Sequence, residues 1–195
     1  MSSHHFVKEG QEPALFIVDA VSLDQVEPLL EWAPLVAVSD HSLDEVLRWG
    51  IKIDTVFCPP DKMTENRSKV MDQEPVQLVL SENDLLREGI LFLIDMNQKA
   101  VNLVVNVTDN HFELAKNFPA LQIALINRNV KWTFHSAGNY TKWLPVKSKL
   151  YLRRNSSEQS FAFQGLHESD PGLEALADGL VSIQSGDVFW IGEYL

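Results

Sequence analysis

Hydrophobic residues occur as short continuous runs, separated by amphipathic or polar segments, through the first two thirds of the chain. Continuous apolar runs of this length are typical of strands buried on both faces. The runs predict strands at 14–18, 35–38, 53–57, 76–80, 101–105 and 121–126. The segments between them predict helices at 22–32, 43–49, 83–96 and 111–117, and a polar helix or loop at 64–71. This alternation predicts an open, largely parallel α/β sheet.

Residues that favour helix ends define the predicted limits of two of these helices. Ser22 is a good N-cap for the first helix, although Pro28 weakens its middle. Ser42 with Glu45 reads as a capping box at the start of the second helix, and Gly50 suits the position just after its end. The second helix is therefore expected to be short and well delimited.

The pattern changes after residue 127. Short strands separated by turn residues are expected at 130–134, 149–152, 160–163, 180–183 and 188–191, and only residues 173–177 suggest a helix. Ser185-Gly186-Asp187 is typical of a hairpin turn between the last two strands. The predicted fold class is α/β: an open, mostly parallel α/β sheet domain over residues 1–127, followed by a small all-β, sandwich-like domain over residues 128–195.

Composition narrows the classes of function. The chain has 195 residues, 45% of them hydrophobic, and a formal net charge of −11. Because a sequence-independent nucleic-acid binder needs a basic face, we expect no nucleic-acid partner. The apolar run at 90–94 is too short to span a bilayer and no signal peptide is recognisable, so we expect a cytoplasmic protein without a membrane partner. The single cysteine, Cys58, follows an apolar strand and is expected to be a buried small residue.

Carboxylates follow several of the predicted strands. Asp40 and Asp61 come after the strands at 35–38 and 53–57, and Asp84 follows the strand at 76–80. In many α/β proteins such carboxylates hold a metal-bound phosphate ligand at one edge of the sheet. The alternative is helix capping or a solvated loop, where aspartate is common. The same two interpretations, metal ligand or helix cap, apply to Asp109 with His111.

Four segments together resemble the thiamine pyrophosphokinase family. Its Asp-Gly-Gly or Asp-Gly-Ala motif, with the later Gly-x-x-Pro-Asp, falls on Asp40, Gly50 and Asp54. Its Gly-Asp-x-Asp-Ser motif falls on 58–62 and retains Asp61. Its Asp-x-x-Lys-Thr-Asp motif falls on 81–84 and retains Asp84, and its Gly-Gly-Arg-x-Asp-His motif is approximated by 108–111. The chain departs from the family at His41, Ser42, Pro59 and Lys62, which replace its glycines, second carboxylate and serine, and it lacks the motif lysine and arginine.

The resemblance implies a function and a set of site residues. The family transfers a pyrophosphoryl group from ATP to thiamine, giving thiamine diphosphate and AMP, with Mg²⁺ and as a homodimer. It implies catalytic roles for Asp61 and Asp84, substrate or nucleotide contacts for Asp40, Asp109 and His111, and Mg²⁺ ligation by Asp40, Asp61 and Asp84. The β-domain would then bind thiamine. The alternative is a catalytically inactive family member that serves as a ligand-binding or structural dimeric protein.

Overall fold

A computed structural model describes residues 12–195, which belong to two compact units that divide after Arg128. The first unit contains the alternating strands and helices, and the second contains only strands. Each unit is described by itself below. The α/β class with a β-rich second part, predicted from the sequence, is confirmed.

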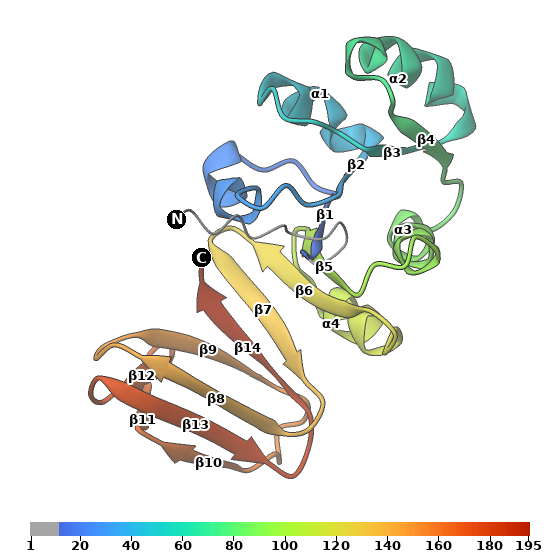
Figure 1. The fold of residues 1–195 in the computed structure, drawn as a ribbon. Coiled ribbons are helices and arrows are strands. Elements are labelled where there is room, and N and C mark those ends of the chain that lie inside the picture. Colours follow the sequence, from blue (N-terminus) through green and yellow to red (C-terminus); the bar gives the residue numbers. More distant parts are fainter. Residues whose placement is uncertain (1–11) are drawn as a thin grey trace, which may run out of the picture. The chain divides into compact units, whose positions relative to one another are not determined.

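The first unit is built on six parallel strands in the order β6-β5-β1-β2-β3-β4 (Figure 1). Leu15 in the central strand lies opposite Val36 on one side and Asn102 on the other. The strands are β1 Ala14–Ile17, β2 Val36–Ser39, β3 Thr55–Cys58, β4 Gln77–Leu80, β5 Ala100–Val104 and β6 Gln122–Asn127. Nearly every residue of β1, β2, β3 and β5 is buried, as continuous apolar runs predict.

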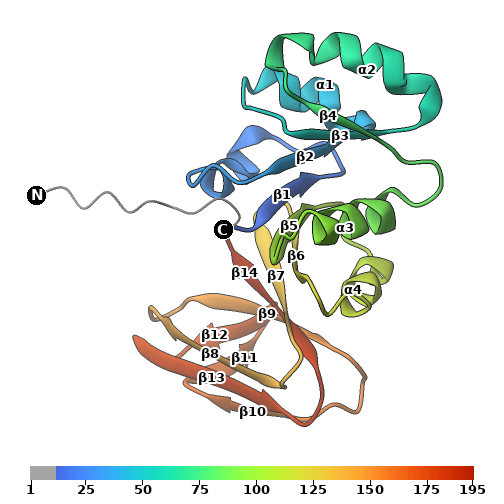
Figure 2. The same cartoon turned by 45° about the vertical axis from the view of Figure 1, so that its right-hand side comes forward.

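Helices connect these strands and cover both faces of the sheet. The α-helices are α1 Asp40–Arg48, α2 Met63–Lys69, α3 Leu85–Asp95 and α4 Asp109–Lys116. Short 3-10 turns are η1 Leu23–Gln25, η2 Glu27–Leu29, η3 Pro60–Lys62 and η4 Met71–Gln73. In Figure 2, α3 and α4 lie on one side of the sheet, and α1 lies on the other with the 3-10 turns that follow β1.

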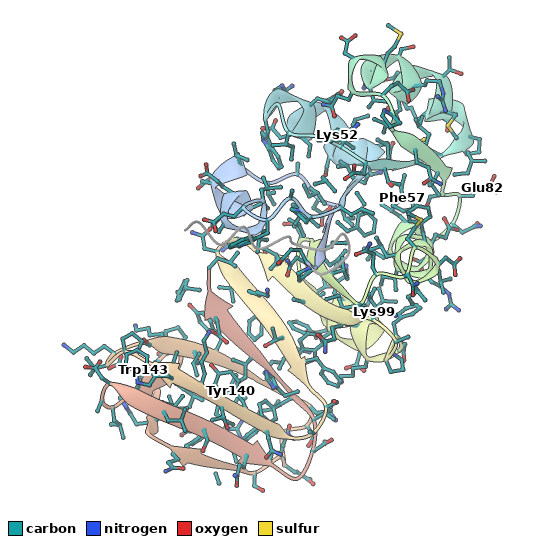
Figure 3. The ribbon with its side chains drawn as sticks, viewed as in Figure 1. Lys52, Phe57, Glu82, Lys99, Tyr140 and Trp143 are labelled. Atoms are coloured by element: carbon teal, nitrogen blue, oxygen red, sulfur yellow. The ribbon has the colours of Figure 1, made fainter. Side chains whose placement is uncertain are left out.

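Alternate residues of β1 supply the two halves of this core. Leu15 and Ile17 pack with Leu43 and Val46 of α1 on one face. Phe16 points to the opposite face, where its ring centroid lies 5.1 Å from that of Phe57. Phe57 (labelled in Figure 3) is in turn 5.4 Å from Phe92 of α3, edge to face. The two-residue repeat of a strand therefore assigns aliphatic side chains to one layer and aromatic rings to the other.

The second unit is a sandwich of two antiparallel sheets. Within the unit, one sheet has the order β11-β12-β9-β14-β7 and the other β10-β13-β8. Their inner faces share a core that includes Tyr140, Ile183, Phe189 and Ile191. The strands are β7 Val130–His135, β8 Asn139–Leu144, β9 Lys149–Arg154, β10 Phe161–Gln164, β11 Leu166–Ser169, β12 Gly172–Ala175, β13 Gly179–Ser185 and β14 Phe189–Tyr194.

Several local predictions in the first unit are wrong in detail. The helix expected at 22–32 is replaced by η1 and η2, because Pro28 has no backbone N–H for a continuous α-helix. The second helix begins earlier than expected, at Asp40. Its N-cap is Ser39, whose hydroxyl oxygen accepts a hydrogen bond from the Ser42 N–H at 3.3 Å.

In the second unit, the helix suggested at 173–177 is wrong, because residues 172–175 form strand β12. Strands β8 and β11 are additional to those expected. The hairpin expected at 185–187 is also wrong: β13 pairs with β8 and β10, whereas β14 pairs with β7 and β9. Ser185-Gly186-Asp187 instead connects one sheet of the sandwich to the other.

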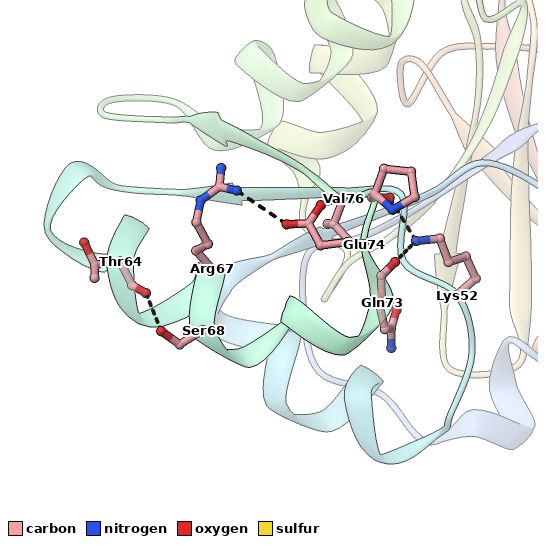
Figure 4. A network of polar contacts seen from close by, with 8 residues as sticks. Lys52, Thr64, Arg67, Ser68, Gln73, Glu74 and Val76 are labelled. Atoms are coloured by element: carbon pink, nitrogen blue, oxygen red, sulfur yellow. Dashed lines mark hydrogen bonds and ion pairs between the residues drawn. The ribbon is translucent and has the colours of Figure 1, made fainter.

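A polar network ties the connection before β3 to the connection before β4 (Figure 4). The Lys52 ammonium group donates hydrogen bonds to the backbone carbonyl oxygens of Gln73 and Pro75, the latter at 2.9 Å. Arg67 of α2 lies 3.5 Å from the Glu74 carboxylate. These contacts join loops at the amino-terminal edge of the sheet, opposite the edge where the candidate site lies.

Candidate functional site

The strand order defines a switch point between β1 and β5. The chain proceeds from β1 outward through β2, β3 and β4, then returns to the other side of β1 as β5. In open parallel sheets, the connections leave in opposite directions at such a point and open a crevice beyond the carboxyl ends of the strands. The residues that follow β1 and β5 are therefore the first to consider.

Asp19 follows β1 and binds the segment that follows β5. Its Oδ2 accepts a hydrogen bond from the Asn106 N–H at 2.6 Å. The N–H groups of Val18 and Asp19 donate to the Val104 carbonyl oxygen at 3.0 and 3.3 Å. Asp19 is not among the site residues expected from the sequence, although it ends an apolar strand in the same way that Asp40 does. That shared position was the available signal.

His111 lies beside this junction, in the first turn of α4. Its Nδ1 accepts a hydrogen bond from the Thr108 backbone N–H at 2.9 Å, and the Thr108 side chain completes a capping box. Because Nδ1 acts as an acceptor, the ring proton of the neutral imidazole resides on Nε2. Burial lowers the pKa of His111, and the negative charge of Asp19 acts in the opposite direction. The helix-cap interpretation of His111 is thus what the structure presents, and Asp109 occupies the same first helical turn.

Asp40 is the first residue of α1, directly after β2. Its side chain is 13% exposed, whereas that of His41 is 81% exposed, so the neighbouring imidazole faces solvent. Ser39 and Ser42 hold this turn against β1, since both hydroxyls donate to the Val18 carbonyl oxygen, at 2.6 and 2.8 Å. The two serines therefore have a structural role at a position where the resemblance implies small residues.

The negative charges of Asp40 and Asp61 both raise the pKa of the buried Cys58 thiol. Burial raises the pKa of Cys58, the Asn66 side chain lowers it through a hydrogen bond, and the charges of Asp40 and Asp61 raise it further. Cys58 is the last residue of β3 and is fully buried, as expected from the sequence. Asp40 follows β2 and Asp61 follows β3, so the two carboxylates lie beyond the carboxyl ends of neighbouring parallel strands.

Asp84 has a different local role. It is the N-cap of α3, and its Oδ1 accepts a hydrogen bond from the Arg87 backbone N–H at 3.1 Å. The same loop, which includes the exposed Glu82 labelled in Figure 3, surrounds the Glu88 carboxylate. The Ser81 hydroxyl and the backbone N–H groups of residues 82–84 keep the pKa of Glu88 below its ordinary value. Capping and loop anchoring account for the carboxylates of this segment.

The donor set fits Mg²⁺ only in its simpler binding mode. Within residues 12–195, no three His, Cys, Asp or Glu side chains form a group that could hold a metal ion. Mg²⁺ is, however, commonly bound through one or two carboxylates together with waters and substrate phosphates. Asp40 and Asp61, which follow the neighbouring strands β2 and β3, are the pair that suits this mode. The nearby Lys62 ammonium already lies 3.1 Å from the Glu65 carboxylate.

A large groove of about 990 Å³ lies at the opposite, amino-terminal edge of the sheet. Asp54, one of the positions that match the family motif, lines this groove, and its Oδ2 accepts a hydrogen bond from the Val36 N–H at 2.8 Å. Lys52 and Lys99, both labelled in Figure 3, also line it. Asp54 therefore connects two strands at the edge remote from Asp40 and Asp61.

Comparison with solved structures shows what the fold resembles. Thiamine pyrophosphokinase from Bacillus subtilis superposes with a TM-score of 0.71 at 12% sequence identity, over 94% of this chain and 99% of that one. The enzyme from Geobacillus thermodenitrificans gives 0.69 at 13% identity, over 93% and 97% of the two chains. Yeast thiamin pyrophosphokinase gives 0.68 at 9% identity, over 96% and 88%.

Sequence comparisons give no match of their own. No protein-family model and no curated protein matches the chain. Among the described residues, no helix combines the length and the apolar character needed to cross a membrane. Similarity at these identities concerns the fold, and the chain has the fold of the thiamine pyrophosphokinases.

Proposed function

We propose that the protein is a thiamine pyrophosphokinase-type transferase, which moves a pyrophosphoryl group from ATP to thiamine and releases AMP. The observation that carries this proposal is the similarity of fold over nearly the full length of both chains. The switch point in strand order between β1 and β5 supports it, because nucleotide-binding α/β proteins bind their ligands at this position. The protein is proposed to act as a cytoplasmic homodimer, like the family it resembles.

The proposal assigns a role to each carboxyl-edge residue. Asp40 and Asp61 are the residues that would hold Mg²⁺, which neutralises phosphate charge when bound. Asp84 would position the substrate from the N-terminus of α3, and Asp109 and His111 would contact the nucleotide from the N-terminus of α4. In this arrangement the protein contributes mainly positioning and charge, which is the principal requirement of phosphoryl-group transfer.

The test is direct formation of product. Purified protein is incubated with ATP, MgCl₂ and thiamine, and thiamine diphosphate and AMP are measured by chromatography. The proposal expects equal amounts of both products, and their loss in Asp61→Asn. Asp72→Asn, an exposed aspartate in η4, is the control that should retain turnover. Absence of product from the wild-type protein at saturating substrates would reject transfer.

A second candidate is a catalytically inactive protein of this fold that binds a ligand. The observation that favours it is that two expected site residues, Asp84 and His111, accept helix-capping hydrogen bonds. In addition, Ser42, which stands where the family has a glycine, donates to the Val18 carbonyl group. Titration calorimetry with ATP and with thiamine separates the candidates. Binding of either ligand without product supports the second one, whereas the absence of heat with both rejects it together with the first.

A further inference from the structure

The junction of β1 and β5 brings together two side chains with opposite hydrogen-bonding character. Asp19 is half-buried, and its Oδ2 is engaged by the Asn106 N–H at 2.6 Å. A carboxylate accepts several hydrogen bonds, so Oδ1 is the oxygen left to serve a ligand. Ala20 and Asn106, which flank it, are exposed, so this part of the junction borders solvent.

His111 supplies the complementary donor. The Thr108 backbone N–H donates a hydrogen bond to His111 Nδ1, with 2.9 Å between the two nitrogens. The neutral imidazole therefore carries its proton on Nε2. The ring is half-buried. Both side chains bind the segment that follows β5: Asp19 accepts from the Asn106 N–H, and His111 accepts from the N–H of Thr108, two residues further along. The capping box thus determines which hydrogen-bonding atom the ring presents.

The Asp19 acceptor and the His111 donor together complement one arrangement of hydrogen-bonding groups on a ligand. In amino-substituted nitrogen heterocycles, an exocyclic amino group donates and the adjacent ring nitrogen accepts. We propose that Asp19 and His111 form a recognition pair for such a ring, with Asp19 Oδ1 accepting from the amino group and His111 Nε2–H donating to the ring nitrogen. This inference rests on the proposed function, where both adenine and the aminopyrimidine of thiamine have this arrangement.

The carboxylate also makes the pair selective. Phosphate groups and other anions are repelled by Asp19, so the pair addresses the heterocycle and not the phosphates of a nucleotide. A ring without the amino group leaves the Asp19 acceptor unpaired beside a ring carbon, which costs binding because a buried polar group loses its partner. Selectivity for the amino group is therefore the property to measure.

Calorimetry on the full chain with small probes tests this pair. Adenosine and thiamine are titrated separately, which identifies the source of the ring, each beside its analogue without the amino group (purine riboside, and thiamine lacking its pyrimidine amino group). At least one amino compound is expected to bind at least tenfold more tightly than its analogue. Equal binding of both members of each pair, or no binding of any probe, would overturn the inference.

Substitutions then assign the two atoms. Asp19→Asn keeps an oxygen for the Asn106 N–H but presents NH₂ to the ligand, so binding should weaken at least tenfold. His111→Glu keeps the oxygen that caps α4 but removes the donor to the ligand, whereas His111→Gln keeps both. The His111→Gln protein should therefore bind the amino compound more tightly than the His111→Glu protein. Asp24→Asn, an exposed aspartate in η1, is the control.

Thermal melting accompanies each titration, because unchanged melting separates lost recognition from lost folding. Unchanged affinity in Asp19→Asn, or equal affinities in the two His111 variants, would refute the pair. These binding measurements do not depend on turnover. If the ligand binds through Asp19 but the protein shows no transferase activity, only the proposed function is rejected. If the protein turns over substrate but binding does not require Asp19, only the recognition pair is rejected.

Discussion

Gly89 of α3 lies directly against the ring of Phe16 in β1. A Cβ built at position 89 would be 2.3 Å from Phe16 Cε1 and 2.7 Å from Cζ, far inside van der Waals contact. Phe16 is fully buried and its ring also packs against Phe57, at 5.1 Å between ring centroids, so a shift of the ring would disturb a second buried contact. This close approach sets the distance between α3 and the sheet.

Gly89→Ala should therefore destabilise the protein, although alanine favours the helical state by about 1 kcal/mol over glycine. Overpacking of a buried contact costs about 1–3 kcal/mol, which exceeds that gain. Chemical denaturation should show a lower midpoint with an unchanged slope. Gly186→Ala is the control, since no atom lies within 4 Å of the added carbon there. Equal or greater stability of Gly89→Ala would contradict the close packing.

The Val18 carbonyl oxygen accepts hydrogen bonds from the hydroxyls of Ser39 and Ser42. We therefore expect the losses of stability in the two single serine variants not to add up to the loss in the double variant. Ser42→Ala alone should cost about 1 kcal/mol, because Ser39 still donates at 2.6 Å. Ser39→Ala should cost more, since it also removes the N-cap of α1. The double variant leaves the carbonyl without either donor, so its loss should exceed the sum of the single losses. Additive free energies of unfolding would show that the two hydroxyls act independently.

Gln159 is a buried amide that joins two loops of the sandwich. Its Oε1 accepts from the Asn155 N–H at 2.7 Å, and its Nε2 donates to Ser185 Oγ at 2.9 Å and to the carbonyl oxygens of Asp187 and Val188 at 3.2 and 3.0 Å. Gln159→Leu removes all of these hydrogen bonds from a buried position and should cost about 2–4 kcal/mol. Gln159→Glu places a carboxylate oxygen against two carbonyl groups, so its destabilisation should be larger at pH 8 than at pH 5. Equal destabilisation at both pH values would show that the carboxylate avoids these carbonyls.

His135 of β7 predicts a loss of stability in mild acid. Its ring stacks on Phe189 at 5.4 Å and meets Tyr140 edge to face at 5.3 Å. Burial lowers the pKa of His135 from the ordinary 6.5, while a hydrogen bond to the Asn139 backbone and the charge of Glu193 act in the opposite direction. Between the lowered pKa and 6.5, the unfolded state binds more protons, so stability falls as the pH decreases through this window.

The measurement compares the free energy of unfolding at pH 7.5 and pH 5.5 in the wild-type protein and in His135→Gln. His111 has the same direction of pKa shift, so the comparison is repeated in His111→Gln, which retains the capping acceptor. Each variant should lose less stability between the two pH values than the wild-type protein does. A loss identical to that of the wild-type protein would exclude the substituted histidine as a source of the pH dependence.

The strand pattern of the first unit was predictable because continuous apolar runs specify burial on both faces. The runs that contain Phe16, Val38 and Phe57 each became a central strand. The burial of Cys58 followed from the same rule. The start of α1 was harder to predict. Ser39 and Ser42 are both good N-cap residues, and the structure uses Ser39, whereas both hydroxyls donate to the carbonyl group of Val18, which follows β1.

The second unit shows what a local pattern cannot resolve. Ser185-Gly186-Asp187 has the composition of a hairpin turn, yet β13 and β14 belong to different sheets. Turn residues specify a change of direction, whereas the partners of each strand depend on long-range pairing. Leu173 is compatible with a helix or a strand, and pairing with Leu150 of β9 decides for the strand.

The sequence by itself determined that the chain is an α/β sheet followed by a β-rich region, because burial and periodicity are local properties of each segment. It also indicated carboxylates at the ends of strands. Tertiary structure alone decided which of these groups meet: the order β5-β1-β2 joins Asp19 to Asn106 across 87 positions of the chain and places Asp54 at the opposite edge. The reason is that strand order depends on how helices pack on both faces of the sheet, and no single segment carries that information.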